Sequence, residues 1–462
     1  MAVDLTLSRQ GCHAMIDLRW RVLHYREEIF AEGDQFIPVG QVVSSIENFA
    51  HRTDRFGSHV TKRRWPRVGE LTSLVGLRAP ELNSVRRRLS QAHTIEDLRR
   101  IALRRTPRSV FDYTDGAAGE ELGLSRARET FRNLEFMPSV LRDVSQVDIS
   151  SSPFGVRSPM PFAFAPTGFT RMMNYQGEPA VARVAARRGI PYALSTLGTT
   201  SIEDVAEVSV GGRLWFQLYV WRDRLTAEDL VRRAEAAGYE ALILTVDVPV
   251  AGVRLRDVRN GLTIPPKLTA RTLVDMAVHP SWWANLLTTE PLEFASLTSW
   301  SGTVADLLDS IIDPTMTIDD LAWLRSNWNG RLVVKGIQSV ADARRVFDAG
   351  ADAVILSNHG GRQLDRAPVP LRLLPEVRSA LGPDVELWLD TGVLNGADIV
   401  AGHALGADLV LVGRAYLYGL MAGGERGVDR AAEILTDEII RTLKLLGVSS
   451  IAELSPEHVR VT

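Results

Sequence analysis

Short apolar runs alternate with amphipathic stretches along the chain from residue 161 onward. The apolar runs, which we predict to be strands, cover residues 161–165, 191–194, 214–218, 241–246, 332–334, 353–356, 385–389 and 409–412. The stretches with helical spacing cover residues 177–188, 202–208, 227–237, 317–328, 339–348, 371–380, 396–404 and 428–446. Strict alternation of strands and helices is typical of a parallel sheet.

Eight strand–helix units predict an α/β fold of the (β/α)8 TIM-barrel type. A doubly wound open sheet is the alternative, and it is weakened because no Gly-x-Gly-x-x-Gly loop follows the first strand. The barrel domain is expected over residues 93–462. Its first helix is marked by Thr94 as the cap with Asp97 three residues later. Pro107 then opens a second helix.

Two regions fall outside this rhythm. Residues 1–92 carry many charges and little periodicity, so we expect an N-terminal extension that is partly mobile, with one amphipathic helix over residues 16–30. A long insertion follows the fourth strand, at about residues 255–315, and contains the aromatic stretches 280–287 and 294–300. Such an insertion is either a lid or subunit contact, or a surface that docks on a membrane or a partner.

Composition narrows the protein class. Of 462 residues, 45% are hydrophobic and 24% charged, as in soluble globular proteins, and the net charge of −3 does not favour nucleic acid as a partner. The single cysteine, Cys12, excludes an intrachain disulfide and a cysteine-based metal site, and no metal is expected. The chain has neither an apolar run long enough for a membrane span nor the features of a signal peptide, so we expect a cytoplasmic protein.

Polar residues or glycines follow every predicted strand, where the active sites of such barrels lie. They are Pro166, Thr167, Gly168, Ser195, Gln217, Tyr219, Thr245, Asp247, Arg254, Lys335, Ser357, His359, Arg362, Asp390, Gly392, Gly413 and Arg414. A role in a turn can explain one such residue, but it does not readily explain one at the end of every strand. Lys335 directly follows three apolar residues, so it needs an anionic partner. The glycines after the seventh and eighth strands sit where barrels commonly bind phosphate, which indicates a phosphorylated cofactor.

His359 and Arg362 suggest the chemistry. An imidazole takes up a proton near neutral pH, and a guanidinium holds a carboxylate through two parallel hydrogen bonds. A lone His in a polar loop is more often structural, but its neighbours here favour chemistry on a small carboxylic acid. From the residues alone, Asp247 and Asp390 are both candidates to hold the imidazole. Tyr113 is either a core aromatic or a hydroxyl of the site.

Four motifs together resemble one family. They are Ser357-Asn358-His359-Gly360-Gly361-Arg362-Gln363-Leu364-Asp365, Phe216-Gln217-Leu218-Tyr219, Thr245-Val246-Asp247 and Val334-Lys335-Gly336. Residues 93–460 resemble the FMN-dependent α-hydroxy acid oxidising family, and in detail its actinobacterial L-lactate dehydrogenases. The resemblance implies an FMN enzyme, a homotetramer, that oxidises an L-2-hydroxy acid such as L-lactate to the keto acid.

The resemblance also implies residue roles. His359 would be the base and Asp247 its partner; hydride transfer and initial proton abstraction both use this His, so both routes stay open. Arg254 and Arg362 would bind the substrate carboxylate, with Tyr113 and Tyr219 hydrogen-bonded to substrate. Lys335 would lie at the flavin edge where charge develops, and Asp390 on the flavin side chain. The remaining residues would line the isoalloxazine (Pro166, Thr167, Gly168, Ser195, Gln217, Thr245, Ser357) or meet the phosphate (Gly392, Gly413, Arg414).

Departures from the family pattern bear on the ligands. Leu394 replaces an Arg that normally touches phosphate, so Arg414 and backbone amides would carry more of that contact. Leu197 and Ala251 replace larger residues of glycolate oxidase, which enlarges the pocket. Residues 1–92 lack a recognisable haem domain. We therefore expect a quinone or another non-oxygen acceptor, with peripheral contact at the inner face of the cell membrane through residues 255–315.

Two other activities stay open. One is an oxygen-using 2-hydroxy acid oxidase or lactate monooxygenase. Gly168 stands where glycolate oxidase has Ala, and such a Gly is shared by some dehydrogenases of the family and by lactate monooxygenase. The other is a barrel that binds a phosphorylated ligand without redox chemistry.

Overall fold

The computed structural model describes residues 81–261, 274–275, 277–295 and 312–461, together with the backbone of two strands nearer the N-terminus. The chain divides into two compact units, Met1–Ala79 and Pro80–Thr462. In the first unit, β1 (Ala2–Gln10) pairs with β2 (His13–Arg21) in an antiparallel hairpin. The helix predicted over residues 16–30 is wrong for residues 16–21, because Ile16, Leu18 and Trp20 alternate with charged residues at the period of a strand. Residues 22–30 lie outside the described part.

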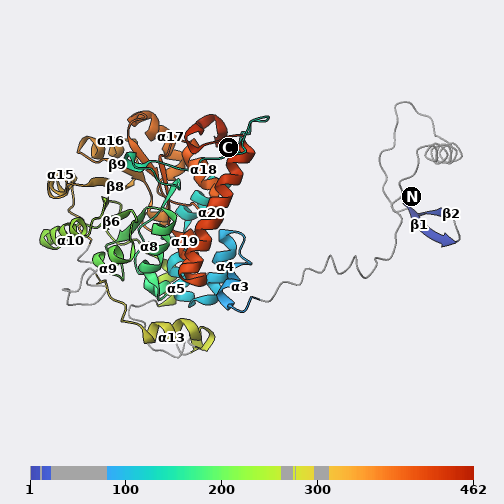
Figure 1. The fold of residues 1–462 in the computed structure, drawn as a ribbon, viewed down its shortest axis with the longest axis horizontal. Coiled ribbons are helices and arrows are strands. Elements are labelled where there is room, and N and C mark those ends of the chain that lie inside the picture. Colours follow the sequence, from blue (N-terminus) through green and yellow to red (C-terminus); the bar gives the residue numbers. More distant parts are fainter. Residues whose placement is uncertain are drawn as a thin grey trace. The chain divides into compact units, whose positions relative to one another are not determined.

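The second unit contains a closed barrel of eight parallel strands (Figure 1). The strands are β4 (Phe162–Phe164), β5 (Tyr192–Ser195), β6 (Leu214–Leu218), β7 (Ala241–Thr245), β8 (Arg331–Ile337), β9 (Ala353–Leu356), β10 (Glu386–Leu389) and β11 (Leu409–Val412). The last strand pairs with the first, at Val410 with Phe162, which closes the ring. The predicted TIM barrel is therefore confirmed, and the open sheet is wrong.

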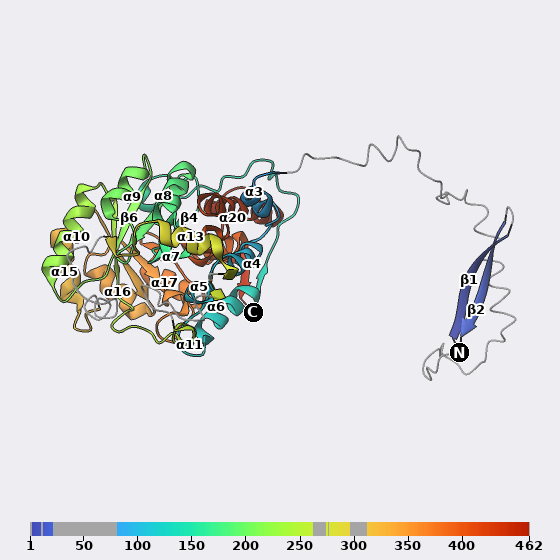
Figure 2. The same ribbon diagram turned by 90° about the horizontal axis from the view of Figure 1, so that it is seen from below.

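Helices surround the barrel, as Figure 2 shows. Those between or after the strands are α8 (Gly177–Arg188), α9 (Ile202–Val208), α10 (Arg224–Ala236), α15 (Ile318–Asn327), α16 (Val340–Asp348), α17 (Pro370–Leu381), α18 (Gly396–Ala404), α19 (Arg414–Gly423) and α20 (Glu425–Leu446). Several begin at a side chain that accepts a backbone N–H, as Ser201, Thr317 and Asn395 do. Such caps satisfy amides that have no partner within the helix.

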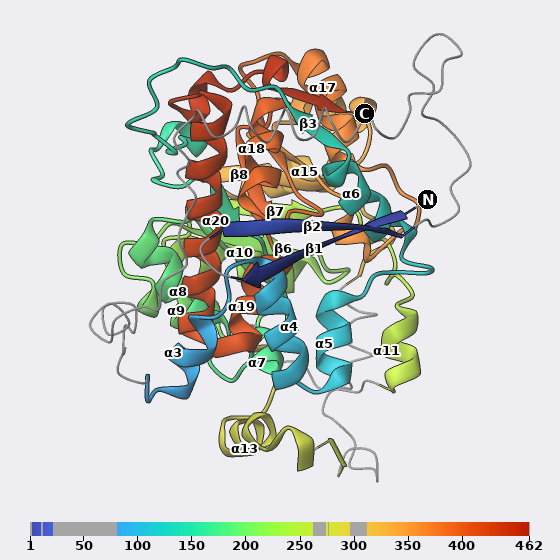
Figure 3. The ribbon, with the colours of Figure 1, turned by 90° about the vertical axis from the view of Figure 1, so that its right-hand side faces the viewer.

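In the described part of the chain, four helices precede the barrel: α3 (Ser84–Leu89), α4 (Ile95–Arg105), α5 (Arg108–Asp115) and α6 (Leu122–Arg132). The predicted capping box of Thr94 and Asp97 is confirmed at the start of α4. The Arg88 guanidinium of α3 donates to the Ala422 carbonyl of α19 at 3.0 and 3.2 Å. Figure 3 shows α3, α4 and α5 along one side of the unit. The short elements are β3 (Leu134–Phe136), β12 (Val459–Val461), η1 (Pro153–Gly155), η4 (Ile451–Glu453) and η5 (Pro456–His458).

Side chains fill the barrel interior. The stacked rings of Trp215 and Trp388, with centroids 4.8 Å apart, lie with Phe154 among small and branched residues from the six other strands. Both Trp side chains are fully buried. The barrel interior is thus a packed core, which these rings fill toward the end where the strands begin.

The insertion after β7 contains two described helices, α11 (Leu255–Asn260) and α13 (Pro280–Thr288). The Trp282 indole of α13 donates to the Met172 carbonyl of α7 (Thr170–Met173) at 3.0 Å. The Phe294 ring lies 4.5 Å from Phe169, just before α7. Most of the aromatic stretch 294–300 lies outside the described residues. No helix in the described part of the chain is long and apolar enough to cross a membrane.

Candidate active site

A histidine and an aspartate pair at the end of the barrel where the strands finish. His359 begins η3 (His359–Gly361) directly after β9, and its backbone N–H donates to Ser357 Oγ at 3.0 Å. His359 Nδ1 lies 2.9 Å from Asp247 Oδ1; the imidazole side chain is 25% exposed and the carboxylate 2%. Nε2 has no hydrogen bond within the described residues, so it is free to act on a ligand. Of the two candidate aspartates, Asp247 is the one beside the imidazole.

Asp390 pairs with a lysine instead. Lys335 Nζ lies 2.9 Å from Asp390 Oδ2 and donates to Ser357 Oγ at 3.0 Å, and that hydroxyl donates to Asp390 Oδ2 at 2.8 Å. Burial lowers the pKa of Lys335, but the charges of Asp390 and Asp247 raise it above its ordinary value. Burial raises the pKa of Asp390, and the Lys335 charge brings it below its ordinary value. Both groups are therefore charged near neutral pH.

Two arginines flank the ring of Tyr113. The guanidinium carbons of Arg362 and Arg254 lie 4.8 and 5.5 Å from the Tyr113 ring centroid. Burial, and then the Arg254 charge, lower the pKa of Arg362 to about 10. Burial and the Asp247 charge raise the pKa of Tyr219 well above its ordinary value, so its hydroxyl stays protonated and can donate. Like charges crowded beside hydroxyl groups favour a small anionic ligand such as a carboxylate.

The structure offers a place for a polar, flat cofactor ring. Ser195 pairs in register with Gln217 across β5 and β6, and Thr245 with Lys335 across β7 and β8. Ser195 Oγ donates to Gln217 Oε1 at 3.0 Å. Gln217 Nε2 and Thr245 Oγ1 are buried and lack a hydrogen-bond partner in the described part of the chain. Buried polar groups without partners are costly, so these atoms fit a ligand with carbonyl and N–H groups along one edge.

The loop over residues 166–168 lines the same end of the barrel. Phe169 N–H donates to the Leu197 carbonyl at 3.0 Å, and the hydroxyls of Thr167 and Tyr416 share a hydrogen bond. A Cβ on Gly168 would lie 2.8 Å from Leu197 Cβ. The packing of this chain therefore requires glycine at position 168, independently of any effect that this residue has on the choice of electron acceptor.

The three residues expected to bind the phosphate, Gly392, Gly413 and Arg414, differ in their contacts and in the space around them. Gly392 has a φ of 84°, and its carbonyl accepts from the Arg128 guanidinium. A Cβ on Gly413 would approach nothing nearer than 3.8 Å, so there is space at the start of α19. Arg414 instead donates through Nε to the Thr114 carbonyl at 2.9 Å and through Nη2 to that of Gly116 at 2.8 Å. The third nitrogen, Nη1, faces Gly360, where a Cβ would lie 2.7 Å away.

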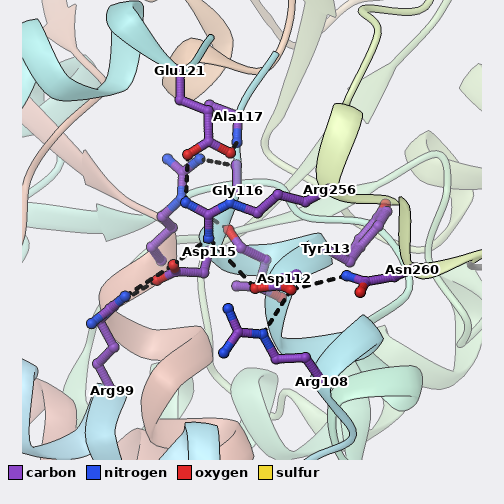
Figure 4. Close-up of polar contacts among 12 residues, drawn as sticks. Arg99, Arg108, Asp112, Tyr113, Asp115, Gly116, Ala117, Glu121, Arg256 and Asn260 are labelled. Atoms are coloured by element: carbon purple, nitrogen blue, oxygen red, sulfur yellow. Dashed lines mark hydrogen bonds and ion pairs between the residues drawn. The ribbon is translucent and has the colours of Figure 1, made fainter. Parts of the chain in front are cut away.

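An ionic network that the sequence analysis missed ties α5 to α11 (Figure 4). Arg256 Nη1 lies 3.0 Å from Asp115 and 3.5 Å from Asp112, and Nη2 pairs with Glu121. Arg99 also binds Asp115, while Arg108 and Asn260 bind Asp112. The network holds Tyr113 on α5 and Arg254 at the start of α11. The i, i+3 spacing of the two aspartates was the only signal in the sequence.

Residues 102–461 match the family model described as FMN-dependent dehydrogenase. The chain belongs to this family. Its cofactor is FMN, and the unpartnered Gln217 and Thr245 groups and the charged Lys335 fit the polar edge of a flavin. The family and its relatives make the protein an FMN-dependent hydroxy acid dehydrogenase.

Named relatives extend over most of the chain. The "Putative L-lactate dehydrogenase" of Mycobacterium tuberculosis is 58% identical over 397 residues, 86% of this chain and 96% of that protein. The (S)-mandelate dehydrogenase of Pseudomonas putida is 40% identical over 370 residues, 79% of this chain and 93% of that protein. A crystal structure described as the monotopic membrane protein (S)-mandelate dehydrogenase is 39% identical, with a TM-score of 0.78, covering 80% of this chain and 100% of that chain.

Proposed function

We propose that the enzyme oxidises L-lactate to pyruvate and passes the electrons to a membrane quinone. The observation that carries the first half is the His359–Asp247 pair beside two arginines that crowd the ring of Tyr113. A base next to a carboxylate-binding pair suits a small 2-hydroxy acid. The relative at 58% identity bears an L-lactate dehydrogenase name, which supports lactate over larger acids.

The geometry supports the following proposed roles. Arg362 and Arg254 hold the substrate carboxylate, and the Tyr219 hydroxyl, kept protonated, donates to the substrate. His359 takes a proton at Nε2, and the buried Asp247 carboxylate stabilises the imidazolium that results. FMN, when bound, would accept the two electrons. The residues that would hold its ring are Ser195, Gln217, Thr245 and Lys335, and those for its phosphate are Gly392, Gly413 and Arg414.

Substrate choice is tested by steady-state turnover with a fixed soluble dye and a series of 2-hydroxy acids. We expect L-lactate to give a higher kcat/KM than glycolate or L-mandelate, and D-lactate to give none. A preference for L-mandelate would replace lactate as the proposed substrate. It would be consistent with the pocket enlarged at Leu197 and Ala251.

The proposal that quinone is the electron acceptor rests on the insertion after β7. Val274, Val278 and Leu287 expose apolar side chains, and α13 is attached through Trp282 to α7, next to the loop over residues 166–168. Apolar side chains at the edge of an active site suit contact with a bilayer, where quinones reside. A related crystal structure carries the description of a monotopic membrane protein. Both observations favour a peripheral membrane enzyme over a soluble oxidase.

Deleting residues 280–300 is expected to leave dye turnover largely intact and to lower turnover with quinone in vesicles. A milder pair is Leu287→Gln on α13, with Leu225→Gln on α10 as the control, since both side chains are exposed. The quinone effect is expected for Leu287 alone. If oxygen reoxidises the flavin as fast as quinone does, the acceptor is oxygen. If neither change affects quinone turnover, the insertion is not the contact for quinone. Light scattering tests the homotetramer that we propose for the holoenzyme.

A further inference from the structure

A pocket of about 260 Å³ lies apart from the proposed catalytic groups, between α3, α4, α13 and the loops around α7 and α19. Its basic lining residues are Arg88, Arg105 and Arg171, and its apolar lining includes Trp282, Leu286 and Met421. Figures 1 and 3 show α3, α4 and α13 at the same end of the unit. Among the residues that the structure describes, no Asp or Glu lines the pocket.

The three arginines have no carboxylate partner among the residues that the structure describes. Arg88 donates only to the Ala422 carbonyl, and Arg171 to the carbonyls of Glu290 and Pro291. The Arg105 side chain makes no hydrogen bond or ion pair within the same described ranges. Burial, and then the nearby charge of Arg105, lower the pKa of Arg88. Positive charge is therefore concentrated here without internal compensation, which favours an external anion.

The surroundings indicate where that anion comes from. Arg86, Arg87 and Arg104, beside the pocket residues on α3 and α4, are exposed and have no ion pair in the described part of the chain. On the other side, α13 contributes Trp282 to the pocket and exposes Leu287. Basic side chains next to exposed apolar ones are the combination that binds anionic bilayers.

We propose that this pocket binds the phosphate headgroup of an anionic phospholipid. The arginines would hold the phosphate, while Trp282 and Leu286 at the wall would contact the less polar part of the lipid. A guanidinium is well suited to phosphate because of its paired, charge-assisted hydrogen bonds. This inference rests on the membrane contact of the proposed function and adds lipid selectivity to it. A headgroup bound there would hold α13 against the bilayer.

The test compares two neighbouring arginines of α4. Arg105 lines the pocket and Arg104 does not, yet both are exposed and both carry one charge. The full-length, FMN-loaded enzyme and its Arg105→Gln and Arg104→Gln variants are titrated with vesicles of phosphatidylcholine, with and without phosphatidylglycerol. Flavin absorbance and melting temperature check that each variant is folded. One surface charge is worth about fivefold in binding to anionic vesicles.

We expect Arg104→Gln to weaken binding to the phosphatidylglycerol vesicles by at most about fivefold, and Arg105→Gln by at least about tenfold, because headgroup hydrogen bonds are also lost. Equal losses of vesicle affinity in the two variants would indicate binding by a general basic surface and would contradict the proposed headgroup pocket. If the wild-type enzyme binds neither vesicle, the membrane contact fails and the pocket fails with it. If millimolar inorganic phosphate releases the enzyme where chloride of equal ionic strength does not, the ligand is free phosphate and not a lipid.

Discussion

Asp247→Asn separates the charge of the carboxylate from its geometry. An asparagine oxygen can still accept from His359 Nδ1, 2.9 Å away in the wild type, so the imidazole keeps its orientation. Only the negative charge is removed. The second carboxylate oxygen, Oδ2, is buried without a hydrogen-bond partner among the described residues, so part of the cost of burying this charge is uncompensated. We therefore expect the melting temperature of the holoenzyme to stay the same or to rise.

The expected loss of rate follows from distance and burial. Asp247 is 2% exposed, so water does not replace the lost charge. Opposite charges about 4 Å apart interact by about 4 kcal/mol at an effective dielectric constant of about 20. The imidazolium that forms during reaction would lose this stabilisation. About 4 kcal/mol corresponds to a rate about three orders of magnitude lower.

Stopped-flow reduction of the flavin by L-lactate without an acceptor measures this step directly. The control is Asp257→Asn, because Asp257 is a partly buried carboxylate 3.7 Å from Arg254 with no contact to His359. The control is expected to change the rate by less than about fivefold, as a loosely paired charge does. Flavin reduction within tenfold of wild type in Asp247→Asn would refute the proposed role of the charge. A large loss of melting temperature would instead indicate a structural role.

Further predictions concern the other charged groups. His359→Gln is expected to keep FMN and lose at least about three orders of magnitude in turnover, and near-normal turnover would contradict its role as base. Arg362→Lys should raise KM and lower kcat, since an ammonium lacks the planar two-point grip; unchanged kinetics would mean that the guanidinium binds elsewhere. Arg256→Met should raise KM for the hydroxy acid, and an unchanged KM would contradict the positioning role. The free energy of unfolding should fall by only about 1–3 kcal/mol, because Asp112 and Asp115 keep other partners. The lowered pKa of Asp390 stabilises the fold above the ordinary aspartate pKa, and this stabilisation is lost as pH falls below about 4; urea unfolding should show less acid dependence in Asp390→Asn, and an identical profile would contradict the ion pair.

The barrel could be predicted because its strands are continuous apolar runs. Residues 241–246 and β7 (Ala241–Thr245) agree within one residue. The predicted strand 332–334 was too short, since β8 continues through Lys335 and Gly336 to Ile337. Those two residues read as loop in sequence, but the lysine is held within the strand by Asp390 and Ser357. Tertiary partners made the difference, and no local pattern encodes them.

The site was predictable only where strand ends carry it. His359, Asp247 and Lys335 are brought together by the barrel itself. The engagement of Arg414 with carbonyls at the end of α5 depends on how that helix folds over the barrel mouth. The same is true of the Arg256 network, in which α5 and α11 are distant in sequence. Strand spacing carries no information on contacts between such segments.

The packed barrel floor bears on the order of catalytic events. Trp215, Trp388 and Phe154 fill the end opposite the proposed site, so within the described residues the interior offers no second route to it. Substrate, product and electron acceptor then share one entrance. Each has to leave before the next arrives, which favours a ping-pong scheme with parallel double-reciprocal plots. Excess lactate should compete with quinone for the reduced enzyme. Inhibition by high lactate concentrations would therefore indicate that the two molecules use the same entrance to the active site.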